Sequence, residues 1–243
     1  CANSSGRCLV AWLETEPVMW ERGIRTRLLD DTGIPIGNEA VLVEGDAYLF
    51  NPRVSYNPDL DEFLVVYWTE WPTGVIDVTA QRVRASDGLL LSSAVVATGT
   101  DFERKDARAA HLQGHDRYLI AYTCEDAAEN EKVCATIAAG DLTGFGPEFD
   151  IVTPGTDDSG PAVGAAGDEY LVAWKSQQTW QDPMEIRARR VSADGTPLGS
   201  TSGFLVSGFQ NVPGASVRDV QFVSEQGFLV GWYHSDASSV TGP

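Results

Sequence analysis

The stretch Tyr170-Leu171-Val172-Ala173-Trp174 decides the fold, because the sequence contains four more versions of it. The other copies are Cys8–Trp12, Phe63–Tyr67, Tyr118–Tyr122 and Phe228–Trp232. The leucine at the second position recurs at intervals of 55, 55, 52 and 58 residues. Self-similarity at such a regular interval is typical of repeat architectures, in which each repeat is one structural unit.

The same four segments surround each copy. The repeated phrase is nearly all apolar and rich in β-branched and aromatic residues, which predicts a strand buried on both faces. A short run such as Arg53–Tyr56 precedes it, and a segment of period two such as Ile186–Val191 follows. A turn containing Asp194-Gly195 then leads to a fourth, short apolar segment. Four short antiparallel strands per repeat, with no helical period, predict β-propeller blades rather than a β-sandwich.

The repeats span the whole sequence, so we predict one all-β propeller domain over residues 1–243. Its repeats occupy roughly residues 1–50, 51–105, 106–157, 158–214 and, incompletely, 215–243. The first copy begins with a shortened segment at Cys1–Ser5 and the last ends soon after its repeated phrase. Two arrangements fit: a five-bladed ring with Ser238–Val240 as a stub, or an open part of a longer array, which the shortened start favours. An open arrangement has an unpaired strand edge that can self-associate.

The fourth copy carries a resemblance to a known kind of repeat. Tyr170–Trp174 followed by Glu185–Gly195 resembles the "YLVVW…DI…ARVSADG" repeat of large secreted bacterial proteins with propeller-like arrays. The resemblance covers essentially the whole chain and is weakest in the third copy, where Thr136–Asp141 replaces the usual segment. It implies a propeller in a secreted or cell-surface protein. That family mostly lacks an assigned activity, so the resemblance implies a fold and a compartment.

Composition excludes several classes of partner. The 243 residues include 35 acidic and 17 basic side chains, a formal net charge of −18, which argues against nucleic-acid binding. The apolar runs are far shorter than the roughly 20 residues of a membrane-spanning helix, so we predict no membrane insertion. Fourteen of the 17 basic residues are arginines, and many recur at fixed repeat positions. Local arginine clusters therefore keep an anionic ligand in play.

The four cysteines form two local pairs, Cys1 with Cys8 and Cys124 with Cys134. Each pair flanks a short polar stretch, so we predict two disulfides, which are typical of an extracellular or periplasmic compartment. A cysteine at the start of a mature chain is also a candidate lipid-anchor site. No CxxC occurs and the histidines lack ligand spacing, so we predict no metal site and no cofactor.

Three arginines are candidate ligand-binding residues. Arg53, Arg108 and Arg218 each lie 11 residues before the leucine of the repeated phrase, in the segment that lines the channel of a propeller. The fourth copy has Gly160 at this position, or Ala162 if its turn is two residues shorter. Converging guanidinium groups can bind a carboxylate, sulfate or phosphate in bidentate fashion. The alternative is that they form ion pairs with neighbours such as Asp106 and Asp219.

Three tryptophans are the second group of candidate ligand-binding residues. Trp20, Trp71 and Trp180 fall in the connections that follow the repeated phrase in copies one, two and four. An exposed indole ring is a flat apolar platform on which a sugar can stack. The alternative is that each ring caps the seam between two blades. Trp12, Trp174 and Trp232 lie within the repeated phrase, so we predict that they belong to the core.

We assign no catalytic residue, because the sequence contains no nucleophile elbow, zinc-protease motif or P-loop. His111 and His115 are interpreted as polar turn residues. We therefore predict an extracellular module that binds a glycan or a protein partner. The alternatives are a glycoside hydrolase or lyase on the same scaffold, which needs an inward-facing carboxylate pair, and a purely structural repeat of a larger surface protein.

Overall fold

The computed structural model describes residues 2–4, 6–15, 22–45, 47–99, 104–125, 130–153, 157–177, 182, 184–208, 214–223 and 227–235. In these residues every regular element is a β-strand, as predicted, and none is a helix. The strands form five antiparallel sheets in chain order. Within the part of the chain that the structure describes, no helix is long and apolar enough to cross a membrane.

Four of the sheets have four strands each. The first contains β1 (Ala2–Ser4), β2 (Arg7–Thr15), β3 (Arg22–Asp30) and β4 (Pro35–Gly45). The second contains β5 (Tyr48–Asn57), β6 (Glu62–Glu70), β7 (Ile76–Arg84) and β8 (Leu90–Gly99). The third contains β9 (Arg104–Leu112), β10 (Arg117–Glu125), β11 (Glu131–Ala139) and β12 (Phe149–Asp150). The fourth contains β13 (Asp157–Ala166), β14 (Glu169–Gln177), β15 (Glu185–Ser192) and β16 (Phe204–Gly208).

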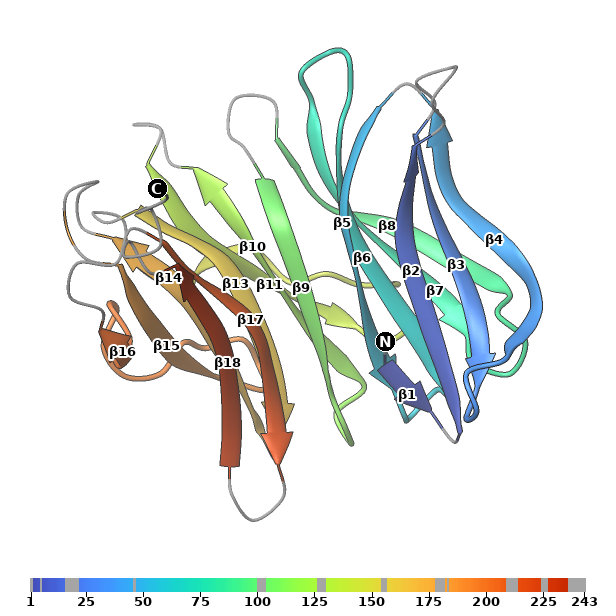
Figure 1. Cartoon of the computed structure of the whole chain (residues 1–243). Helices are drawn as coiled ribbons and strands as arrows, with labels where there is room; N and C mark the ends of the chain where they lie inside the picture. The colour runs from blue at the N-terminus through green and yellow to red at the C-terminus, as the bar shows by residue number, and fades with distance from the viewer. Residues whose placement is uncertain are drawn as a thin grey trace, which may run out of the picture.

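The fifth sheet differs from the others. In the described residues it consists of β17 (Gly214–Val223) and β18 (Gly227–Ser235) alone. The first strands of consecutive sheets pack side by side, β5 on β9, β9 on β13 and β13 on β17. The sheets thus follow one another around the molecule as the blades of a β-propeller (Figure 1).

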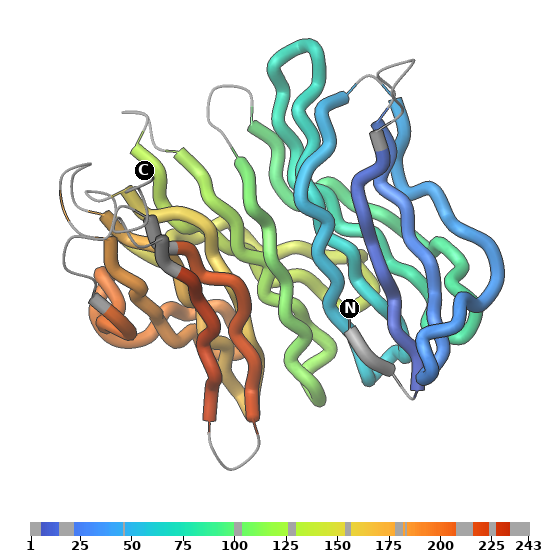
Figure 2. The backbone as a smooth tube through the Cα atoms, viewed as in Figure 1, coloured from blue at the N-terminus to red at the C-terminus, as the bar shows by residue number. Residues whose placement is uncertain are grey.

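The ring has a seam between its last and first blades. Among the described residues, β17 and β18 form no packed layer with β1 and β2 comparable to those between the other blades. Figure 2 shows the first blade in blue and the last in red on opposite sides of the view, with β9 between them. Of the two predicted arrangements, the described residues form the open one. The predicted stub at Ser238–Val240 lies outside the described residues.

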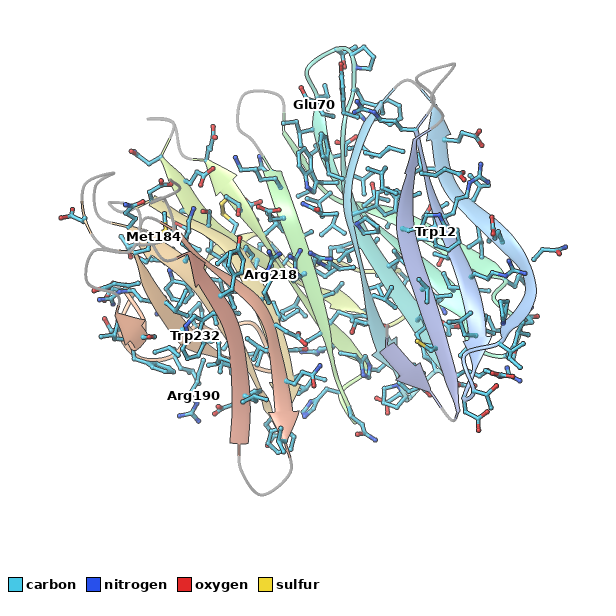
Figure 3. The ribbon with its side chains drawn as sticks, in the orientation of Figure 1. Trp12, Glu70, Met184, Arg190, Arg218 and Trp232 are labelled. Carbon is cyan, nitrogen blue, oxygen red and sulfur yellow. A yellow bond between two sulfur atoms is a disulfide. The ribbon has the colours of Figure 1, made fainter. Side chains whose placement is uncertain are left out.

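The repeated phrase is fully buried only in the middle blades. In β6, β10 and β14 its five residues are all buried. The prediction that Trp232 belongs to the core is wrong, because 39% of this residue is exposed in the two-stranded fifth blade. Trp12 in β2 is half-buried, whereas Trp174 in β14 is 0% exposed as predicted. Figure 3 shows Trp12 and Trp232 in the two terminal blades.

The turns between the third and fourth strands fit between blades. Gly195 has a φ of 90°, as the predicted Asp-Gly turn requires, and a Cβ there would lie 2.8 Å from the side chain of Ile137 in the preceding blade. In the divergent third copy, Gly140 takes the corresponding place, and its N–H donates to the carbonyl oxygen of Asp116 at 2.8 Å. Glycine there is forced by space, since a Cβ would lie 1.8 Å from Asp116 Oδ1.

One predicted disulfide is confirmed. Cys124 of β10 and Cys134 of β11 are bonded, with their Cα atoms 5.9 Å apart, so the bridge closes this hairpin. Cys8 is also disulfide-bonded, and its predicted partner Cys1 lies outside the described residues.

Candidate functional site

Each inner strand, meaning β5, β9, β13 and β17, carries a β-bulge near its beginning. The pairing with the next strand shifts between Phe50 and Arg53 in β5, and between Lys105 and Arg108 in β9. It also shifts between Ser159 and Ala162, and between Val217 and Asp219. The first three bulges contain a residue with positive φ: Asn51 (47°), Asp106 (55°) and Gly160 (62°). These are residue types that tolerate the left-handed conformation, and bulges redirect the side chains beside them.

The inner strands surround a central cavity of about 1000 Å³. The first blade contributes Val10 and Ala11 of β2, because its own first strand is short. Neutral and apolar side chains such as Ser55, Ala110 and Val163 make up most of the wall. This volume lies in the range typical of small-molecule sites. The cavity is therefore the candidate binding site of the molecule.

The structure brings Arg53, Arg108 and Arg218 to this cavity, although not at equivalent positions. Arg53 lies opposite Val66 and Arg108 opposite Ala121, each two residues after the leucine of the repeated phrase. The pairing places Ala162 at this position in the fourth blade, which resolves the open alternative against Gly160. In the fifth blade the equivalent residue is Asp219, opposite Gly231, and Arg218 is the bulge residue itself.

The misalignment of Arg218 comes from the length of a turn. Ser55 pairs with Leu64, nine positions later, whereas Gln221 pairs with Leu229, eight positions later. Counting 11 residues back from each leucine therefore overshoots by one in the fifth blade. The guanidinium of Arg218 lies 4.3 Å from the ring centroid of Tyr233 on β18. Figure 3 shows Arg218 beside β17, toward the centre of the molecule.

Arg108 is the most buried of the three cations. Burial lowers the pKa of Arg108 to about 10, and the positive charges of Arg53 and Arg218 lower it further. The carboxylates of Asp106 and Asp219 oppose this change. Nη1 of Arg108 donates to the carbonyl oxygen of Ala107 at 2.9 Å, whereas its Nε has no hydrogen-bond partner. A desolvated cation with an unused donor thus faces the cavity.

The expected ion pairs with Asp106 and Asp219 are not formed in the described residues. Asp106 Oδ1 accepts a hydrogen bond from Asn51 Nδ2 at 3.1 Å. Asp219 accepts from the N–H of Val220 at 2.9 Å and from Gln221 Nε2 at 2.8 Å. Both carboxylates therefore hold the backbone and amides around the bulges, and they leave the arginine nitrogens available.

His111 also lines the cavity, which the sequence did not predict. It belongs to β9 and is buried, so its interpretation as a polar turn residue is wrong. Its Nε2 lies 3.7 Å from Asp59 Oδ2 and 4.0 Å from Asp116 Oδ1, and neither ring nitrogen has a hydrogen bond. Burial lowers the pKa of His111, and the two carboxylates oppose the shift. His115 does lie in a turn, where its Nε2 is 2.9 Å from Asp168 Oδ1 of the next blade.

Of the three candidate tryptophans, Trp71 is the one in the described residues, and Trp20 and Trp180 lie outside them. Trp71 follows Glu70, which pairs with Tyr48 at the beginning of β5. The ring is therefore at the end of the propeller where the bulges lie. It is 41% exposed, and its Nε1 donates to Asp77 Oδ2 at 2.9 Å. The bond fixes the indole edge and leaves ring surface exposed.

A carboxyl pair lies at the same end, between the third and fourth blades. Glu131 and Asp157 hydrogen-bond each other, and Lys105 Nζ lies 2.6 Å from Glu131 Oε1. Burial and the nearby Glu131 raise the pKa of Asp157. Burial also acts to raise the pKa of Glu131, but the bond from Lys105 outweighs it and lowers that pKa. Asp158 is buried and accepts a hydrogen bond from Trp174 Nε1 at 2.9 Å, a structural role.

The described residues contain no group of three or more histidine, cysteine or acidic side chains that could hold a metal ion. Asp59 Oδ2, for example, accepts a hydrogen bond from the N–H of Gly114 at 2.9 Å, and Glu62 is paired with Arg82.

Several solved carbohydrate-active enzymes share this fold. An α-L-arabinanase of Penicillium chrysogenum, solved with arabinobiose, has a TM-score of 0.61 at 14% identity, over 95% of this chain and 73% of its own. A β-1,3-galactosidase of glycoside hydrolase family 43 has a TM-score of 0.54 at 13% identity, over 94% and 50%. An α-L-arabinofuranosidase from Fusarium graminearum, solved with an iminosugar inhibitor, has a TM-score of 0.54 at 13% identity, over 88% and 71%. Such similarity confirms the propeller fold, and one fold hosts many functions.

No family model and no curated protein matches the sequence.

Proposed function

We propose that this protein recognises a saccharide in its central cavity. The observation that carries the proposal is the cavity of about 1000 Å³ bounded by the inner strands and β2. Its wall combines small apolar side chains with hydrogen-bonding groups such as Ser55, Gln221 and the arginines. Sugars present both kinds of surface. The similar folds of the arabinanase and the galactosidase are consistent with a saccharide ligand.

Trp71 extends the proposed site. Its exposed ring lies at the end of the propeller where the bulges open the inner strands. We infer that it stacks on a sugar ring that projects from the cavity, a contact worth about 0.5–1.5 kcal/mol when comparable aromatic pairs are measured.

Calorimetric titration with arabinose and galactose oligosaccharides tests the proposal. We expect saturable binding to the wild type and a loss of at least ten-fold in affinity for Ser55→Trp, whose indole fills part of the cavity. Ser93→Trp is the matched control, because Ser93 is exposed on the outer strand β8. Affinity that survives Ser55→Trp but disappears in Trp71→Ala would place the ligand outside the cavity and contradict the proposal.

Hydrolysis of the bound saccharide is the second candidate function. It is favoured by the fold, because the similar structures named above are glycosidases. Glycosidic cleavage needs two carboxyl groups, one as acid and one as base or nucleophile, with about 5–9.5 Å between them. Glu131 and Asp157 hydrogen-bond each other and are therefore too close. Asp106 and Asp219, which both act on Arg108, are the carboxyl groups that we assign to this role.

The release of reducing ends from arabinan and galactan distinguishes the two functions. A hydrolase loses this activity in Asp106→Asn and in Asp219→Asn while it still binds the saccharide. Asp87→Asn is the control, because Asp87 lies in an outer turn beside Arg84. Saccharide binding without release of reducing ends in the wild type identifies a binding module and overturns the hydrolase.

The disulfide supports an oxidising location. The Cys124–Cys134 bridge is of the kind that persists in extracellular and periplasmic proteins. We propose that the protein is secreted or displayed at a cell surface. Alkylation of the protein in intact cells, before and after reduction, tests this: thiols that react without reduction would contradict it.

A further inference from the structure

Two cations in the cavity wall have no anionic partner. Arg53 is half-buried and has neither an ion pair nor a hydrogen bond, and Arg108 is more deeply buried with its Nε unused. The chain has more than twice as many acidic as basic side chains. In such a chain most arginines pair with a neighbour, as Arg82 does with Glu62 and Arg190 with Glu169. Unpaired arginines inside the cavity therefore need a separate explanation.

The arrangement is unfavourable until a negative charge enters the cavity. The charge of Arg53 acts directly on Arg108, and both groups are partly removed from water. Buried cations are costly unless they are paired and hydrogen-bonded. The two carboxylates nearest to Arg108 are engaged by Asn51 and Gln221. An oxyanion between Arg53 and Arg108 would use the unpaired Nε and neutralise the repulsion.

We propose that the cavity selects a short saccharide that carries an oxyanion, a uronate carboxylate or a sulfate ester, and that Arg53 and Arg108 bind this group. The inference rests on the proposed saccharide site and adds the chemical class of its ligand. Guanidinium groups suit it because their parallel N–H donors match the oxygens of both kinds of anion. Arg218, whose guanidinium is stacked on Tyr233, adds positive charge at the side of the cavity.

The length of the ligand follows from the net charge of −18. At physiological ionic strength the Debye length is about 8 Å, so the arginines dominate inside the cavity and the distant acidic residues are screened. A long polyanion would leave the cavity and lie against the acidic exterior. We therefore infer that the ligand is an oligosaccharide of a few units with its charge at the bound end.

Competing titrations with trigalacturonic acid, galactotriose and a galactotriose sulfate ester test the inference on the intact protein. A charge-assisted hydrogen bond corresponds to an affinity gain of about ten-fold to a hundred-fold. We expect the wild type to bind at least one charged trimer ten-fold or more tightly than the neutral trimer. Raising the salt concentration from 50 to 500 mM should reduce this preference, and a long polygalacturonate should bind no better per site than the trimer.

Three variants identify the residues. Arg53→Met should remove most of the preference while it leaves the affinity for galactotriose within about three-fold of the wild type. Arg108→Lys keeps the charge and loses the fork of donors, so it should weaken the charged trimers selectively; its thermal unfolding is measured in parallel because Arg108 is buried. Arg84→Met is the matched control, because Arg84 pairs with Asp87 in an outer turn.

The outcomes separate the inference from the function on which it rests. Binding of the neutral trimer with no preference for either charged trimer overturns the inference and leaves the saccharide site standing. A preference that persists in both Arg53→Met and Arg108→Lys also overturns it. Failure of all three trimers to bind contradicts the proposed function and the inference together. A preference for the uronate or for the sulfate ester alone supports the inference and identifies the source of the oxyanion.

Discussion

Trp174 and Trp232 occupy the same position of the repeated phrase and have opposite environments. Trp174 in the fourth blade is 0% exposed, whereas Trp232 in the fifth blade is 39% exposed. β14 has a partner strand on each side and the fifth blade packed beyond it, but β18 pairs with β17 alone among the described strands. The phrase thus determines a strand, and its neighbours determine whether that strand becomes core.

The largest expected effect comes from the two tryptophans themselves. Trp174→Ala removes a fully buried side chain and the partner of the buried Asp158, so we expect a loss of about 3–5 kcal/mol in the free energy of unfolding. Trp232→Ala should cost less than half as much. Denaturant unfolding of both variants measures the difference. Equal losses would mean that the fifth blade is closed in solution by a segment outside the described residues.

The disulfide gives the next largest effect. The Cys124–Cys134 bridge joins residues separated by 10 positions in the third blade. Loop-closure entropy predicts that Cys124→Ala combined with Cys134→Ala destabilises the fold by roughly 2–3 kcal/mol. Urea unfolding under oxidising and reducing conditions measures this. The double variant should show no further response to a reductant that acts on this bridge, and a wild type insensitive to reduction would contradict the assignment.

His111 makes the middle of the propeller sensitive to acid. Burial lowers its pKa in the folded protein, so the unfolded chain takes up a proton first as the pH falls below about 6.5. Stability is therefore fully present above pH 6.5 and decreases toward pH 5. Thermal unfolding of His111→Gln over this range should show a flatter pH dependence than the wild type. The same slope in both proteins would mean that other groups cause the acid sensitivity.

The smallest effect is expected at the exposed edge of the fifth blade. Leu229 has 63% of its surface exposed, whereas Leu64, at the same repeat position in the second blade, is 0% exposed. Leu229→Ala should change the free energy of unfolding by no more than about 0.5 kcal/mol. Leu64→Ala should cost about 2–5 kcal/mol. A large loss for Leu229→Ala would show that another surface covers it in solution.

The sequence predicts the fold well because the repeat carries local information. Strand periodicity and the Asp-Gly turns place the blades, and Gly88 and Gly195 have the expected positive φ values of 75° and 90°. Burial in the terminal blades could not be predicted, because it depends on strands that pack from outside the repeat. Trp232 has the same sequence context as Trp174, and its different exposure is a property of the assembly.

The candidate site was predictable only in part. Spacing brought Arg53 and Arg108 to equivalent positions, but a turn one residue shorter moved Arg218 into the bulge. The interpretation of His111 failed because its strand continues two residues beyond Ala110, where a turn was expected. The hydrogen bonds that occupy Asp106 and Asp219 arise from the bulges, which have no signature beyond residues that tolerate positive φ, such as Asn51.

A crystal structure of the protein with trigalacturonic acid tests the central claim most directly. We predict that the saccharide lies in the central cavity, with a carboxylate within hydrogen-bond distance of both Arg53 and Arg108. A saccharide bound at an outer surface of the blades, with the cavity arginines unchanged and in contact with solvent alone, would contradict the account.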